Sequence, residues 1–134
     1  APASPSPEPS EPPSDRERAR ALVSEGDAAV RDGALERAET KYQQALRADP
    51  RLAAAHHGLS RVAYHRGRYA DAALHGERAV RHAPREPSYR IDLGDAYYKA
   101  YRYEDAVEQY AEAEAQGHSG AAARLAKARA KLDG

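Results

Sequence analysis

The sequence predicts an all-α solenoid made of three antiparallel helix-turn-helix repeats and a C-terminal capping helix. The main observation is internal similarity at a fixed spacing of 34 residues, which is the signature of stacked helical repeats. The three copies are GALERAETKYQQALRADP (33–50), GRYADAALHGERAVRHAP (67–84) and YRYEDAVEQYAEAEAQGH (101–118). Gly33 and Gly67 open two copies, where a turn is expected, and Pro50 and Pro84 end them, because proline cannot continue a helix.

Residues 1–18 precede the repeats and are expected to form a disordered linker. The first 14, APASPSPEPSEPPS, contain six of the nine prolines and almost no large apolar side chain. Such a segment cannot offset its ordering entropy by burying apolar surface. We interpret it as a tether to a larger parent protein, since the chain begins with Ala rather than Met. The alternative is a ligand for an aromatic-lined groove, for which the segment has no strong recognition motif.

Each repeat is expected to pair a first helix with a second one inside the ranges 19–52, 53–86 and 87–120. Small residues recur where the paired helices must approach closely; they are Gly26, Ser60 and Gly94 in the first helices and Ala38, Ala72 and Ala106 in the second. Tyr101 replaces the turn glycine in the third repeat, so that turn is expected to differ or to be strained.

Residues 121–134 are expected to form the capping helix. An apolar stripe at helical spacing runs along this segment and would cover the exposed end of the array; it consists of Ala121, Leu125, Ala128 and Leu132. The basic residues between them are expected to face water; they are Arg124, Lys127, Arg129 and Lys131.

Residues 19–120 resemble the tetratricopeptide repeat (TPR) family. The resemblance rests on columns that recur in register, namely Leu59/Leu93, Gly26/Gly94, Ala29/Ala63/Tyr97, Ala38/Ala72/Ala106, Ala45/Ala79/Ala113, Tyr42/Tyr110 and Pro50/Pro84. It implies a right-handed solenoid whose first helices line a concave groove and whose second helices form the outer face.

Gly76 stands in the column that holds Tyr42 and Tyr110, inside a predicted helix. A neighbouring side chain, Tyr89 or the stem of Arg90, is expected to fill the space that a tyrosine would occupy, because protein interiors rarely keep voids. A pocket beside residue 76 is the alternative.

The sequence shows no catalytic constellation, so we expect no enzyme activity, no metal and no cofactor. It contains no cysteine, no HExxH motif, no nucleophile elbow and no phosphate-binding glycine loop. Five of the six histidines lie between positions 56 and 82, but their spacing does not converge on a metal, and we expect them to be solvated or half-packed. The 21 basic and 21 acidic residues balance, which argues against nucleic-acid binding, and no apolar run is long enough to insert into a membrane.

The resemblance implies a partner-binding groove on the first helices. The expected lining residues are Val23, Asp27, Val30, His57, Arg61, Tyr64, His65, Ile91, Asp95, Tyr98 and Lys99. One branch of the family grips the terminal carboxylate of chaperone tails with basic residues and Asn. The matching positions here are Val23, Asp27, Gly58, Ser88 and Asp92, none of which is basic, so we do not expect such a clamp.

Two functions follow as hypotheses. The first is a non-catalytic scaffold or adaptor module, a monomer that binds a short peptide segment or a helix of a protein partner in the groove. The second is a structural or self-association domain that packs against its parent chain or a second copy. The excess of Arg over Lys and the abundance of Ala favour a bacterial source; the absence of Cys fits the cytoplasm or the periplasm, and we favour the cytoplasm.

Overall fold

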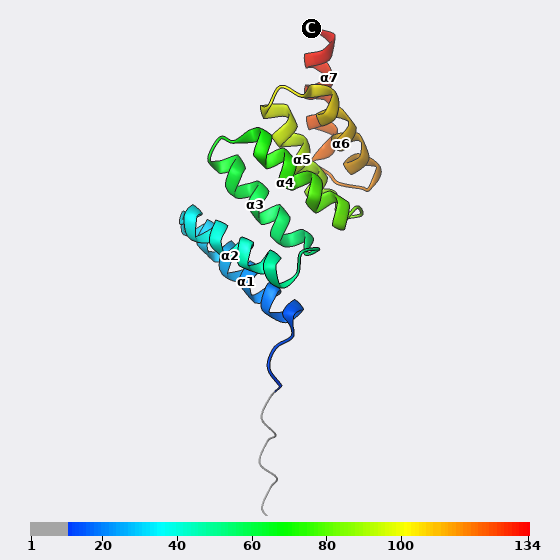
Figure 1. Cartoon of the computed structure of the whole chain (residues 1–134). Helices are drawn as coiled ribbons and strands as arrows, with labels where there is room; N and C mark the ends of the chain where they lie inside the picture. The colour runs from blue at the N-terminus through cyan, green and yellow to red at the C-terminus, as the bar shows by residue number, and fades with distance from the viewer. Residues whose placement is uncertain (1–10) are drawn as a thin grey trace, which may run out of the picture.

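The computed structural model describes residues 11–134 and confirms the all-α solenoid within that range. Its helices are α1 (Asp15–Arg31), α2 (Leu35–Ala48), α3 (Ala53–His65), α4 (Tyr69–His82), α5 (Pro87–Lys99), α6 (Tyr103–Ala115) and α7 (Ala121–Asp133). The helix pairs α1–α2, α3–α4 and α5–α6 stack in chain order, and α7 closes the array at the end opposite α1 (Figure 1). The linker prediction for residues 1–10 lies outside the described residues.

The first helix begins at Asp15, so the predicted linker boundary at residue 18 is wrong. Ser14 is the N-cap, and its hydroxyl accepts a hydrogen bond from the Glu17 amide at 3.2 Å. Asp15 and Glu17 lie in the first turn, where negative charge is favourable to the helix dipole. These capping signals extend α1 over residues that the apolar pattern alone did not include.

The turn between the helices of each repeat has one geometry in all three copies. Gly33 and Gly67 have φ angles of 75° and 74°, and Tyr101 has a φ angle of 63° in the same place. The backbone hydrogen bonds recur as well. In each turn the residue that follows the left-handed one donates its amide to a carbonyl five positions before the donor. The third turn is therefore unchanged in shape, and Tyr101 carries the left-handed strain that glycine avoids.

Tyrosine rings pack on glycine in the seams between helices. Tyr42 is fully buried, and a Cβ placed on Gly26 or Gly58 would lie 2.6 Å or 2.4 Å from its ring. Gly94 makes room for the ring of Tyr110 in the same way, with a distance of 2.5 Å. Because Gly26 belongs to α1 and Gly58 to α3, Tyr42 joins its own repeat to the next one.

Gly76 faces no void, although the residue that fills its space differs from the two expected. A Cβ on Gly76 would lie 3.1 Å from Leu93 Cδ1 and 3.4 Å from Ser60 Oγ. The Leu93 side chain is almost completely buried, at 2% exposure, and occupies this position in place of Tyr89 or Arg90.

The proline carbonyls at the ends of α2 and α4 are held by side chains of the following first helix. His56 Nε2 donates to the Pro50 carbonyl at 2.9 Å, and the Arg90 guanidinium donates to the Pro84 carbonyl at 3.0 Å and 3.2 Å. His56 is only 8% exposed and stacks on His82, so the expectation of a solvated or half-packed histidine is wrong there. With Nε2 donating, Nδ1 of His56 is buried without a hydrogen-bond partner among residues 11–134.

The capping helix buries Ala121, Leu125 and Ala128 against the core, as the apolar stripe predicted. Leu132, the last member of the stripe, remains 46% exposed because α7 continues past the end of the helices it covers.

The two glycine seams provide a matched stability test. Gly58→Ala should lower the free energy of unfolding by about 1–3 kcal/mol, because the new methyl group overlaps a ring that is already held by Gly26. Gly76→Ala should cost less, since a shift of the Leu93 methyl group relieves the contact. Urea unfolding measures the free energy of unfolding of both variants. A larger decrease for Gly76→Ala than for Gly58→Ala would contradict this packing.

Removing the strain at the third turn should stabilise the protein. Tyr101→Gly should raise the free energy of unfolding by about 1 kcal/mol, because a left-handed φ costs a non-glycine residue about 1–2 kcal/mol. The reverse change, Gly67→Ala, is the control and should be destabilising. The prediction fails if thermal unfolding shows Tyr101→Gly to be less stable than the parent.

Stability should fall in mild acid because of His56, which is buried, and His75, which is half-buried. Burial lowers the pKa of His56 and of His75 from the ordinary value of 6.5. Below that value the unfolded chain binds protons that the folded chain resists, so acid favours unfolding. The free energy of unfolding should decrease between about pH 7 and pH 5, and less steeply in His56→Gln. Exposed His65→Gln is the control; equal slopes in His56→Gln and the parent would refute the assignment.

Candidate functional site

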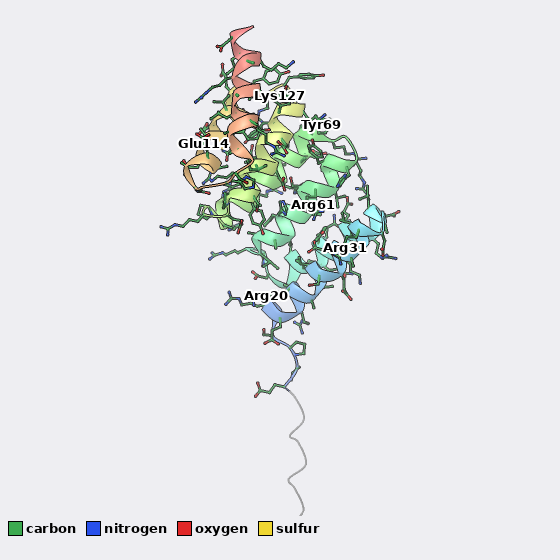
Figure 2. The ribbon with its side chains drawn as sticks, turned by 180° about the vertical axis from the view of Figure 1, so that it is seen from behind. Arg20, Arg31, Arg61, Tyr69, Glu114 and Lys127 are labelled. Atoms are coloured by element: carbon green, nitrogen blue, oxygen red, sulfur yellow. The ribbon has the colours of Figure 1, made fainter. Side chains whose placement is uncertain are left out.

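Two adjoining cavities open on one face of the array, along α3, α5 and α7. The first is lined by Ser60, Arg61, Tyr64, His65, Asp92 and Asp95. The second is lined by Tyr64, Asp95, Tyr98, Lys99, Tyr110, Arg124 and Lys127. Tyr64 and Asp95 line both, so the two cavities form one continuous depression, which we call the groove. Arg61 lies near the middle of the stack, between Arg20 on α1 and Lys127 on α7 (Figure 2).

The groove tyrosines are held in place by aromatic contacts at the helix ends. Tyr64 of α3 meets Tyr69 of α4 edge to face, with ring centroids 5.3 Å apart. Tyr98 and Tyr103 repeat this contact one repeat later, at 5.2 Å. In each pair the tyrosine that lines the groove stays partly exposed, and the contact with the second tyrosine limits the movement of its ring. Burial raises the pKa of Tyr64 above its ordinary value.

Asp95 is held at the centre of the groove by two donors. The Tyr110 hydroxyl donates to Asp95 Oδ1 at 2.5 Å, and Arg124 Nε of the capping helix donates to the same oxygen at 3.0 Å. Burial and this hydrogen bond raise the pKa of Tyr110 well above its ordinary value. Asp95 therefore has a neutral phenol and a cation as its hydrogen-bond partners.

The capping helix contributes to the groove, which the sequence analysis missed. Arg124 contacts Asp95, and Lys127 Nζ lies 5.3 Å from the centre of the Tyr98 ring. Both residues remain exposed to water, as expected, and border the groove as well. They stand three positions apart beside the apolar stripe, and that spacing places both on one edge of α7. Which edge meets the groove depends on how α7 packs against the last repeat.

His57 and Asp92 form a second polar contact near the first cavity. His57 Nε2 donates to Asp92 Oδ2 at 2.5 Å, and the imidazole ring stacks on Tyr89 with centroids 4.5 Å apart. His57 thereby supports Asp92 without lining either cavity.

The structure brings together six of the eleven predicted groove residues and separates the rest. Arg61, Tyr64, His65, Asp95, Tyr98 and Lys99 line the cavities. Val23 and Ile91 are buried in the core at 9% and 4% exposure, which corrects their placement on the lining, because each points into a helix seam. Asp27, Val30 and His57 lie outside both cavities, and Asp27 accepts a hydrogen bond from Tyr42 at 2.5 Å.

The described part of the chain lacks two features, a group of metal ligands and a membrane-spanning helix. Among residues 11–134, His, Asp and Glu do not gather in a group of three that could hold a metal ion. In the same range, no helix combines the length and apolarity that crossing a membrane requires.

Comparisons with known proteins agree with this architecture. A family model described as the tetratricopeptide repeat matches residues 15–87. None of the curated proteins compared with the chain matches it.

Solved structures match over most of the chain. The first TPR of Spaghetti (RPAP3), bound to the HSP90 peptide SRMEEVD, has a TM-score of 0.85 at 19% identity and covers 90% of this chain and 98% of its own. The Sgt2 TPR domain from Aspergillus fumigatus has a TM-score of 0.81 at 26% identity, covering 92% of this chain and 85% of its own. A mutant of the O-GlcNAc transferase from Thermobaculum terrenum has a TM-score of 0.78 at 26% identity; the match covers 88% of this chain but 23% of the transferase.

Proposed function

Because this chain belongs to the tetratricopeptide repeat family, we propose that it is a non-catalytic interaction module that binds a short peptide segment or a helix of a protein partner in the groove. The observation that carries the proposal is the pair of adjoining cavities with Tyr64 at their junction and Tyr98 beside it. The module acts as a scaffold or adaptor, tethered through its N-terminal segment to a larger protein.

Tyr64 and Tyr98 are the anchors of the proposed interface. Both are half-buried, so each presents ring surface and a hydroxyl while losing little conformational freedom on binding. They occupy equivalent positions in α3 and α5, and an extended segment or one face of a helix would meet them in succession. Polar groups surround them on α5 and α7, namely Asp95, Lys99, Arg124 and Lys127.

A relative with the same fold supports a peptide ligand. The Spaghetti TPR is bound to an HSP90 peptide, and it covers 90% of this chain. The terminal-carboxylate clamp is not proposed here, because Val23, Asp27, Gly58, Ser88 and Asp92 provide no cation at the matching positions. The groove of this chain would therefore hold its ligand mainly through the tyrosines.

The tyrosine anchors can be tested directly. Tyr64→Ala combined with Tyr98→Ala should weaken binding of a captured partner segment by at least about 2 kcal/mol, the scale of interface hot spots. Isothermal titration calorimetry measures the change, and circular dichroism checks that helical content and melting are retained, since both rings also pack on the core.

The control is Arg78→Ala with Arg81→Ala on α4, which removes two side chains outside the groove. These changes should leave the affinity unchanged. If they abolish binding while the tyrosine variant binds normally, the partner uses the outer face of the array.

A further inference from the structure

The second repeat departs from its neighbours at two positions that face each other. In the first repeat the Tyr42 hydroxyl donates to Asp27 at 2.5 Å, and in the third the Tyr110 hydroxyl donates to Asp95 at 2.5 Å. The equivalent positions of the second repeat hold Gly76 and Arg61, so both members of the pair are replaced. The change removes an internal hydrogen bond and puts a cation where the other repeats have a carboxylate.

The core does not need Arg61 to close the gap that the missing tyrosine leaves. Leu93 packs on Gly76, and the Ser60 hydroxyl donates to the Ala72 carbonyl at 2.8 Å. Apolar contact and a buried hydrogen bond thus complete this seam. The Arg61 side chain is half-buried and lines the first cavity instead.

Arg61 has no acceptor of its own in the described part of the chain. Its guanidinium forms neither a hydrogen bond nor an ion pair within 4.0 Å among residues 11–134. The two carboxylates that share its cavity are engaged elsewhere: Asp92 accepts from His57 at 2.5 Å, and Asp95 accepts from Tyr110 and from Arg124. Because the half-buried guanidinium of Arg61 is not bonded to residues 11–134, its donors are available to a ligand.

We propose that Arg61 receives a carboxylate of the bound partner segment, so that the groove selects a ligand with an acidic group between or beside its two tyrosine anchors. This inference rests on the proposed function. A carboxylate matches the planar fork of a guanidinium with two parallel hydrogen bonds, which an amide or a hydroxyl cannot reproduce. Arg124 offsets the charge of Asp95, which reduces the repulsion that an incoming anion would meet, and Asp92 is occupied by its hydrogen bond from His57.

The carboxylate has two sources, an Asp or Glu side chain and a free C-terminus, and peptide selection separates them. Displayed random short peptides are selected on the full chain and on Arg61→Gln, and the recovered peptides are synthesised with free and with amidated C-termini. Peptides recovered on the parent should be enriched in Asp or Glu. Replacing the acidic residue by its amide should weaken binding at least about tenfold, which corresponds to about 1.4 kcal/mol. Loss of affinity on amidation alone would assign the terminal carboxylate as the source.

The acidic preference should disappear in Arg61→Gln. It should be reduced in Arg61→Lys, because lysine keeps the positive charge but cannot form the two parallel hydrogen bonds of a guanidinium. Arg81→Gln on α4 is the matched control and should keep the preference. This inference is overturned if the peptides bind through Tyr64 and Tyr98 without an acidic preference, or if they keep that preference in Arg61→Gln. Either result would still support the proposed function. If no recovered peptide depends on Tyr64 or Tyr98, the proposed function fails, and the inference fails with it.

Discussion

The stack depends on the close approach of helices around buried tyrosine rings. Tyr42 lies between Gly26 and Gly58, with no room for a Cβ on either residue, so three helices are held around one ring. Tyr110 makes the same contact with Gly94. Because the ring is rigid and both neighbours lack a side chain, the distance between helices is set by the thickness of the ring. Alanine columns then suffice for the rest of the seam, which explains how a chain without Phe, Trp or Met builds a core.

The same tyrosines connect the core to the groove. Their hydroxyls donate to aspartates of the first helices, and burial raises the pKa of Tyr42 and of Tyr110. In the third repeat this bond positions Asp95 at the junction of the two cavities. The second repeat lacks this pair, and the groove gains a cation, Arg61, that has no acceptor among residues 11–134. A stabilising contact of the outer repeats is thus replaced by a group suited to a ligand.

The capping helix has two roles that its sequence combines on adjacent faces. Ala121, Leu125 and Ala128 cover the end of the core, while Arg124 and Lys127 reach back to Asp95 and Tyr98. The groove therefore extends beyond the three repeats, and a ligand that binds along α3 and α5 would end against α7. This arrangement makes the cap part of the proposed interface as well as of the fold.

The sequence alone determined the repeat length, the helix pairs, the positions of the turns and the apolar face of the cap, because these follow from local periodicity and from the backbone limits of Gly and Pro. The resemblance to the TPR family also indicated six of the residues that line the groove. The sequence could not show that Leu93 fills the space at Gly76, that Ser14 starts α1 at Asp15, or that Val23 and Ile91 turn into the core. Those outcomes depend on the rotation of each helix against its neighbours. Tertiary structure also decided that Arg124 and Lys127 line the groove and that Arg61 finds no acceptor within the described part of the chain. The reason is the same, because contacts between helices far apart in sequence select which edge of a polar face meets the groove.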